Sequence, residues 1–150
     1  MALKGDRHEF DTDISFFMNE AAEKGVVVSV STQGSGAAMD NASALATVKA
    51  NASGAIPLGI LLNDMVDIDL TRQHVNWHKD EVVKGGKVTI LRKGWVVTDK
   101  ISGTPTAGAT AYVAGTGLIS ATQGAGAVAI GSFLSTKDAD GYAKVAINLP

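Results

Sequence analysis

Tyr142-Ala-Lys-Val-Ala-Ile-Asn-Leu149 is the stretch of sequence that decides the fold class of this chain. Its odd-numbered positions hold Ala, Val, Ile and Leu, whereas its even-numbered positions include Lys144 and Asn148. An alternation with a period of two is typical of a β-strand that buries one face and exposes the other. The chain is therefore expected to end in a half-buried strand.

The residues before this run predict a hairpin. Residues 128–134 form a second strand candidate, and Asp138-Ala-Asp-Gly141 separates it from the last strand. An Asp-Gly pair accepts the positive φ values of a type I′ turn, so Asp140-Gly141 is interpreted as a hairpin turn. The alternative, a calcium loop, lacks the third oxygen ligand and the glutamate that such a loop needs.

Short strands separated by glycine continue towards the N-terminus. Tight turns are expected at Lys93-Gly94 and at Gly115-Thr-Gly117. Further strand candidates are residues 26–30, 44–49, 56–62, 65–70, 87–92 and 95–98. Trp95, which opens one of these strands, is expected in the core. Many short strands with turn signals between them are typical of a small β-barrel or sandwich, and we predict such a mainly β fold.

The composition supports this fold and excludes several classes of protein. The 150 residues are 45% hydrophobic but only 5% aromatic, and 17 of them are glycine. Each glycine inside a helix costs about 1 kcal/mol relative to alanine, which argues against a helical bundle. The chain has no cysteine, which excludes disulfides and cysteine catalysis. A net charge of -2 offers no global attraction for nucleic acid. No run has the apolar length of a membrane span or a signal peptide.

Residues 1–24 differ in composition from the rest, and they predict an N-terminal arm in front of a β-barrel body at 25–150. They hold three of the four Phe residues and several charges. Four of their apolar side chains follow a helical spacing: Ile14, Phe17, Met18 and Ala21. The arm is expected to contain a short amphipathic helix or to lie extended across a neighbouring subunit, because a helix of about ten residues is marginal alone.

The patterns for metal binding and catalysis are incomplete. His74 and His78 have the i, i+4 spacing that can bind zinc on a helix, and Asp80 follows closely. The catalytic version needs a glutamate after the first histidine, and position 75 is Val, so solvent-facing histidines are favoured. Trp77 in the same polar stretch is predicted at an interface, because Trp is enriched in binding hot spots. Without an acid, base and nucleophile together, the chain is expected to be an assembly protein with no metal and no cofactor.

The C-terminal half carries a pattern of glycines, short strands and Ser or Thr residues. It runs through Gly94-Trp-Val-Val-Thr, Pro105-Thr-Ala-Gly108, Ala111-Tyr-Val-Ala-Gly-Thr-Gly-Leu-Ile-Ser120, Ile130-Gly-Ser-Phe-Leu-Ser135 and residues 138–149. This layout, over about residues 85–150, resembles that of the head decoration (cement) proteins of tailed bacteriophages. The resemblance implies a β-barrel, β-tulip-like or jelly-roll-like body on the outside of the icosahedral head.

The same resemblance implies the partners and the location of the protein. It implies a homo-oligomer, usually a trimer with a dimer as the alternative, which is made in the host cytoplasm and binds the major capsid protein on the outer surface of the virion. It would stabilise the capsid non-covalently, without nucleic acid or membrane as a partner. Two other functions stay open: another β-module of the virion, such as a head-fibre base or tail component, and a small metal-dependent hydrolase using His74, His78 and Asp80.

The resemblance also implies which side chains of the arm meet the capsid or another subunit. The expected anchors are five apolar residues: Phe10, Ile14, Phe16, Phe17 and Met18. The alternative for Phe17 and Met18 is to pack against their own domain.

Overall fold

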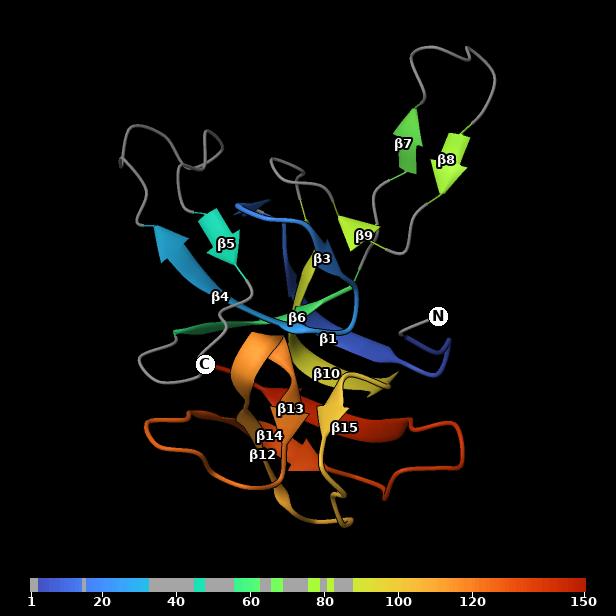
Figure 1. The fold of residues 1–150 in the computed structure, drawn as a ribbon, viewed down its shortest axis with the longest axis vertical. Helices are drawn as coiled ribbons and strands as arrows, with labels where there is room; N and C mark the ends of the chain where they lie inside the picture. The colour runs from blue at the N-terminus through green and yellow to red at the C-terminus, as the bar shows by residue number, and fades with distance from the viewer. Residues whose placement is uncertain are drawn as a thin grey trace.

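The computed structural model of the chain is built mainly from β-strands (Figure 1). It describes residues 3–14, 16–32, 45–47, 56–62, 66–68, 76–78, 81–82 and 88–150. Most of its strands lie in one large sheet, which curls into a half-barrel. The predicted mainly β fold is therefore confirmed.

The large sheet joins strands from both halves of the chain. Its order is β11 (Ile101–Ser102), β13 (Ile119–Ser120), β12 (Thr110–Val113), β14 (Ala129–Phe133), β15 (Ala143–Asn148), β10 (Ile90–Thr98), β6 (Pro57–Leu61), β4 (Val27–Thr32), β5 (Leu45–Thr47) and β2 (Phe17–Met18), with β1 (His8–Asp13) paired to β10. Two short ladders are separate: β3 (Ala22–Glu23) with β9 (Glu81–Val82), and β7 (Val66–Ile68) with β8 (Asn76–His78).

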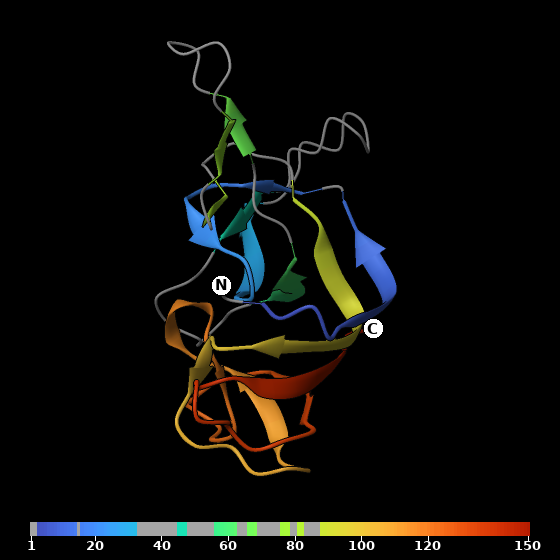
Figure 2. The ribbon, with the colours of Figure 1, turned by 90° about the vertical axis from the view of Figure 1, so that its right-hand side faces the viewer.

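The long strand β10 holds the two halves of the large sheet together. Its Ile90 and Leu91 pair with β6, while the segment from Lys93 to Thr98 pairs with β15. β1 runs antiparallel to β10 and pairs with it from Ile90 to Trp95. Because Ile90 and Leu91 already pair with β6 on one edge, β1 lies along the opposite edge. Figure 2 shows β1 (blue) on the outer side of β10 (yellow).

Gly94 lies inside β10, so the tight turn predicted at Lys93-Gly94 is wrong. Its φ is +141°, and an added Cβ would come within 2.0 Å of the backbone oxygen of His8. Glycine is needed here for the close approach of β1 to β10, and not for a reversal of the chain. Local sequence does not distinguish these two uses of glycine.

The N-terminal residues form strands, so the short helix predicted from their apolar spacing is wrong. β1 and β2 both join the large sheet, and β3 pairs with β9. The edge of β10 offers backbone donors and acceptors to β1, whereas an isolated helix of about ten residues is marginal. No helix within the described ranges has the length and apolar character to cross a membrane. The division into an arm at 1–24 and a body at 25–150 stays a prediction.

Two predicted hairpins are present. A 3-10 turn, η1 (Gly115–Gly117), joins the antiparallel strands β12 and β13. Between β14 and β15, the N–H of Gly141 donates to the carbonyl of Asp138 over 3.1 Å and closes a turn. In this turn Gly141 alone has a positive φ, +87°, so the turn is not of the predicted type I′, which needs two such residues.

The last strand has the alternating burial expected from its sequence. The odd-numbered residues of β15 are buried, and the even-numbered ones are partly or fully exposed. The buried face belongs to the larger of two apolar clusters, in which Phe133 is fully buried. The smaller cluster surrounds Met18 and Leu61 near the other end of the sheet. Burial of each such large apolar side chain stabilises the fold by about 1.5–3 kcal/mol.

Replacement of Gly94 by alanine is expected to lower the free energy of unfolding by about 2–4 kcal/mol. The new methyl group would collide with the His8 carbonyl, and alanine would be strained at this φ. Urea unfolding followed by circular dichroism measures the change. Gly124→Ala is the control, because nothing lies within 4 Å of a Cβ at that position. Equal stability of the two variants would contradict the role given to Gly94.

Candidate interaction surface

Three rings gather on the outer face of β1 and β10, and we call His8, Phe10 and Trp95 the exposed aromatic cluster. The His8 and Trp95 rings stack with their centroids 4.8 Å apart, and Phe10 meets His8 at 62° with a centroid distance of 4.2 Å. The Nζ of Lys144, on the neighbouring strand β15, lies 4.8 Å from the centre of the Trp95 ring. Contacts of this kind fix the rings relative to the sheet.

The prediction that Trp95 belongs to the core is wrong, because Trp95 is only partly buried. Successive residues of a strand face opposite sides of the sheet. Val96 and Thr98 have no exposed surface and occupy the inner face of β10, which leaves Trp95 and Val97 on the outer face. The run Trp-Val-Val is apolar on both faces, so the sequence did not show which face is buried.

An open hollow of about 430 Å³ borders the exposed aromatic cluster. Its lining comes from β1, β10 and β15: Phe10, Lys93, Gly94, Trp95, Ala146, Ile147 and Asn148. The lining is mostly apolar, and Lys93 is its charged member. The small side chain of Ala146, which lies opposite Trp95 in the ladder between β10 and β15, leaves this space beside the large ring of Trp95. The hollow can therefore accept an apolar side chain from a partner.

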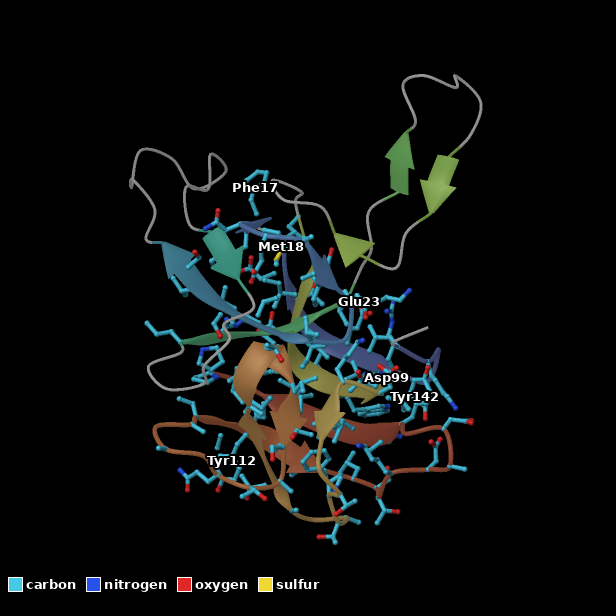
Figure 3. All side chains as sticks on the ribbon, viewed as in Figure 1. Phe17, Met18, Glu23, Asp99, Tyr112 and Tyr142 are labelled. Carbon is cyan, nitrogen blue, oxygen red and sulfur yellow. The ribbon has the colours of Figure 1, made fainter. Side chains whose placement is uncertain are left out.

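The predicted anchor residues lie in two different environments. Phe10 and Ile14 are 70% and 60% exposed, the highest values among the large hydrophobic side chains described. Met18 is 1% exposed and belongs to the smaller apolar cluster, against which Phe16 packs. Figure 3 shows the Phe17 side chain directed away from the body and Met18 directed inwards. Met18 thus packs within its own chain, which is the alternative that the sequence left open.

The predicted histidine pair lies only in part within the described residues. Trp77 and His78 belong to β8, which pairs with β7, whereas His74 and Asp80 lie outside the described residues. Among the side chains that are described, no group of three or more His, Cys, Asp or Glu is arranged to hold a metal ion. The preference for solvent-facing histidines over a zinc site, and the interface role of Trp77, stay predictions.

Ion pairs connect the N-terminal residues to the C-terminal half of the chain. They are Lys4–Asp138 at 3.7 Å, Asp6–Lys144 at 3.6 Å and Glu23–Lys100. The hydrogen bond from Lys100 to Glu23 raises the pKa of Lys100, against the opposing effect of its partial burial. Exposed ion pairs contribute little individually. The N-terminal residues are therefore held to the rest of the chain mainly by the pairing of β1 with β10.

Asp138 also shapes the turn between β14 and β15. Its Oδ1 accepts hydrogen bonds from the backbone N–H groups of Tyr142 and Asp140, both over 2.9 Å. These bonds, above all the one from Tyr142, lower the pKa of Asp138 from its ordinary value of 3.8, and Lys4 acts in the same direction. The ring of Tyr142, labelled in Figure 3, lies 4.5 Å from the Nζ of Lys4. The turn therefore favours the ionised form of Asp138.

The two most exposed large apolar side chains described lie on and directly after one outer strand, β1, and exposed apolar surface often marks a site that binds another protein. The protein-family model described as structural cement protein (E217 gp24/Pam3 gp6) matches residues 5–148, and the chain belongs to this family. A comparison with curated proteins gave no match. The predicted resemblance is confirmed, and it extends over nearly the whole chain. The protein is a structural component of the phage virion that associates with the capsid and stabilises it.

His8 is a member of the exposed aromatic cluster that the sequence did not single out. A usable signal was its spacing from Phe10, since residues two apart on a strand share a face. The pairing of His8 with Trp95 joins residues far apart in the chain, and no local pattern indicates it.

Replacement of Asp138 by asparagine is expected to make the protein less sensitive to acid. A carboxyl group with a lowered pKa in the folded state stabilises the fold at neutral pH, and this contribution is lost as the pH falls from about 4 through the lowered value. Asparagine can still accept both backbone hydrogen bonds but does not titrate. The free energy of unfolding, measured in urea between pH 7 and pH 2, should decline less steeply for this variant.

Asp140→Asn is the matched control, because Asp140 is an exposed carboxylate of the same turn. Its acid decline should follow that of the wild type. If Asp138→Asn and the wild type declined in parallel, the proposed role of the Asp138 charge would be refuted.

Proposed function

We propose that this protein binds the outer surface of the assembled phage head through the major capsid protein, as a homo-oligomer. The main support for this proposal is the match of residues 5–148 to the structural cement protein family. We favour a trimer, with a dimer as the alternative. Synthesis in the host cytoplasm, followed by binding to the finished shell, is part of the same proposal.

Stabilisation follows from selective binding to the assembled shell. A ligand that binds only the assembled state stabilises it by RT ln(1 + [L]/Kd), which is about 2.7 kcal/mol when the free concentration is 100 times Kd. A closed oligomer repeats each contact in every subunit, so that modest contacts add up through avidity. No covalent step is needed for the shell to resist disruption.

We assign the capsid contact to the N-terminal residues, and in particular to Phe10 and Ile14. Both side chains are exposed, and Phe10 also borders the apolar hollow beside Trp95. Aromatic side chains at the centre of an interface often dominate its binding energy. Met18 is not part of the proposed contact, because its side chain is already buried in its own chain. Residues 1–24 would thus act as the capsid-binding segment of a body formed by 25–150.

Removal of the two exposed anchors is expected to weaken binding to expanded heads that lack this protein. The double substitution Phe10→Ser and Ile14→Ser should raise the Kd about 30-fold, which corresponds to roughly 2 kcal/mol. Cosedimentation with the heads measures the Kd. Leu134→Ser is the control, since Leu134 is 48% exposed on a different part of the molecule. Wild-type protein that fails to sediment with the heads would refute the proposed function. Unchanged binding by the double variant would refute the assignment of the anchors.

The oligomeric state is expected to be visible in the free protein. Size-exclusion chromatography with light scattering should give about three times the chain mass of 15.4 kDa for a trimer, and twice that mass for the alternative dimer. The symmetry of the oligomer decides which axes of the shell it can occupy. A monomer at all accessible concentrations would contradict a preformed homo-oligomer.

A further inference from the structure

The outer face of the sheet has a step beside the exposed aromatic cluster. The strand register places Ser132, Ala146 and Trp95 in one row across β14, β15 and β10, and all three are partly exposed. His8 continues this row on β1. The row therefore changes from two small side chains to two stacked rings. The open hollow of about 430 Å³ lies at this change, between Ala146 and Trp95.

An irregularity in the ladder between β1 and β10 places Phe10 at the side of this hollow. The register shifts between Glu9 and Asp11, so Phe10 has no residue opposite it on β10. An extra residue in one strand is a β-bulge, and bulges often redirect a side chain. The Phe10 ring contacts His8, and its centroid lies 6.3 Å from that of Trp95. These contacts hold the aromatic side of the hollow in place before a partner arrives.

The charged side chains near the hollow are matched within the chain. Three pairs of opposite charge lie there: Asp6 with Lys144 at 3.6 Å, Arg7 with Glu9 at 3.0 Å, and Asp11 opposite Lys93 in the ladder. A charged group brought against this surface would have to displace one of these pairings or be buried without a partner, and burial of an unpaired charge is costly. The surface therefore fits a partner that is apolar and carries no charge at the contact.

The capsid supplies such a partner, because the chain belongs to a family of structural cement proteins, which associate with the capsid. We propose, on the basis of the function proposed above, that the hollow receives one large apolar side chain from an uncharged segment of the major capsid protein. Phe10 and Trp95 form its aromatic side, and the small side chain of Ala146 leaves the room for it. Ala146 is thus a residue that determines how large a side chain the hollow accepts. Anchors that fill such pockets often dominate the binding energy of an interface.

Replacement of Ala146 by leucine tests the hollow directly, because the larger side chain would occupy the space of the partner. The Kd for expanded heads that lack this protein, measured by cosedimentation, should rise by about 30-fold or more. The midpoint of urea unfolding should stay that of the wild type, because position 146 borders open space. Ala129→Leu is the matched control: it puts the same side chain on an exposed site of β14 outside the hollow, and it should bind as the wild type. A folded Ala146→Leu protein with the wild-type Kd would overturn the proposal.

Hydroxyl-radical footprinting with mass spectrometry tests the same contact without a substitution. Oxidation of Phe10 and Trp95 should fall by about threefold or more when the wild-type protein is bound to the heads, because a filled hollow excludes water. Oxidation of Leu134, which is exposed on a different part of the molecule, should not change. Equal oxidation of both rings in the free and the bound protein would contradict the proposed contact.

Two further measurements identify the occupant of the hollow. The ratio of the Kd values of Ala146→Leu and the wild type should be the same at about 50 and about 300 mM NaCl, because salt screens contacts between charges. A ratio that changed by about threefold or more would refute an uncharged occupant. Light scattering should give the same oligomer for Ala146→Leu as for the wild type. A smaller oligomer would overturn the proposal, because a second copy of the chain would then fill the hollow.

The two proposals fail in different ways. If the wild type does not sediment with the heads, the proposed function fails and the contact in the hollow fails with it. If the wild type sediments with the heads and Ala146→Leu binds equally well, only the contact in the hollow fails. The exposed anchors Phe10 and Ile14 would then bind the capsid without a side chain of the shell beside Trp95.

Discussion

The pairing of β10 along both of its edges is the constraint on which the rest of the structure depends. One edge is shared by β6 and β15, so this strand joins the N-terminal and C-terminal parts of the large sheet. The other edge carries β1, which can approach because Gly94 has no side chain beside the His8 carbonyl. With a larger residue at position 94, the backbone of β1 would be displaced from β10. The exposed aromatic cluster would then lose the geometry that brings His8 and Phe10 onto Trp95.

Aliphatic and aromatic side chains have different places in this molecule. The largest fully buried side chains described are Val, Leu, Ile and Met, with Phe133 as their aromatic member. The rings of Phe10 and Trp95 lie on the outer face instead, beside an apolar hollow. Aliphatic side chains on the inner face of the curled sheet can pack densely, so the core needs few aromatic residues. Two of the few aromatic residues, Phe10 and Trp95, therefore lie where a partner can reach them, and aromatic side chains offer a partner large contact areas.

The sequence was most informative for features that depend only on residues close together in the chain. The alternation in the last strand predicted β15 and its buried face correctly, and the glycines after β12 predicted the hairpin with β13. Both features involve only neighbouring residues. The sequence misled where a residue type has two uses. Gly94 serves a close contact between strands and not a turn. The spacing of Ile14, Phe17 and Met18 fits a helix, but Phe17 and Met18 form strand β2, because β5, far away in the chain, satisfies their backbone groups. Of the candidate surface, the sequence identified Phe10 and Ile14 but not the stack of His8 on Trp95.

A protein that stabilises a finished shell has to bind the assembled shell in preference to its unassembled subunits. The apolar side chains Phe10 and Ile14 add little to the stability of the isolated chain, because they remain mostly exposed in it. Their burial would contribute only in the complex, so the free energy they provide would stabilise the assembled particle rather than the free protein.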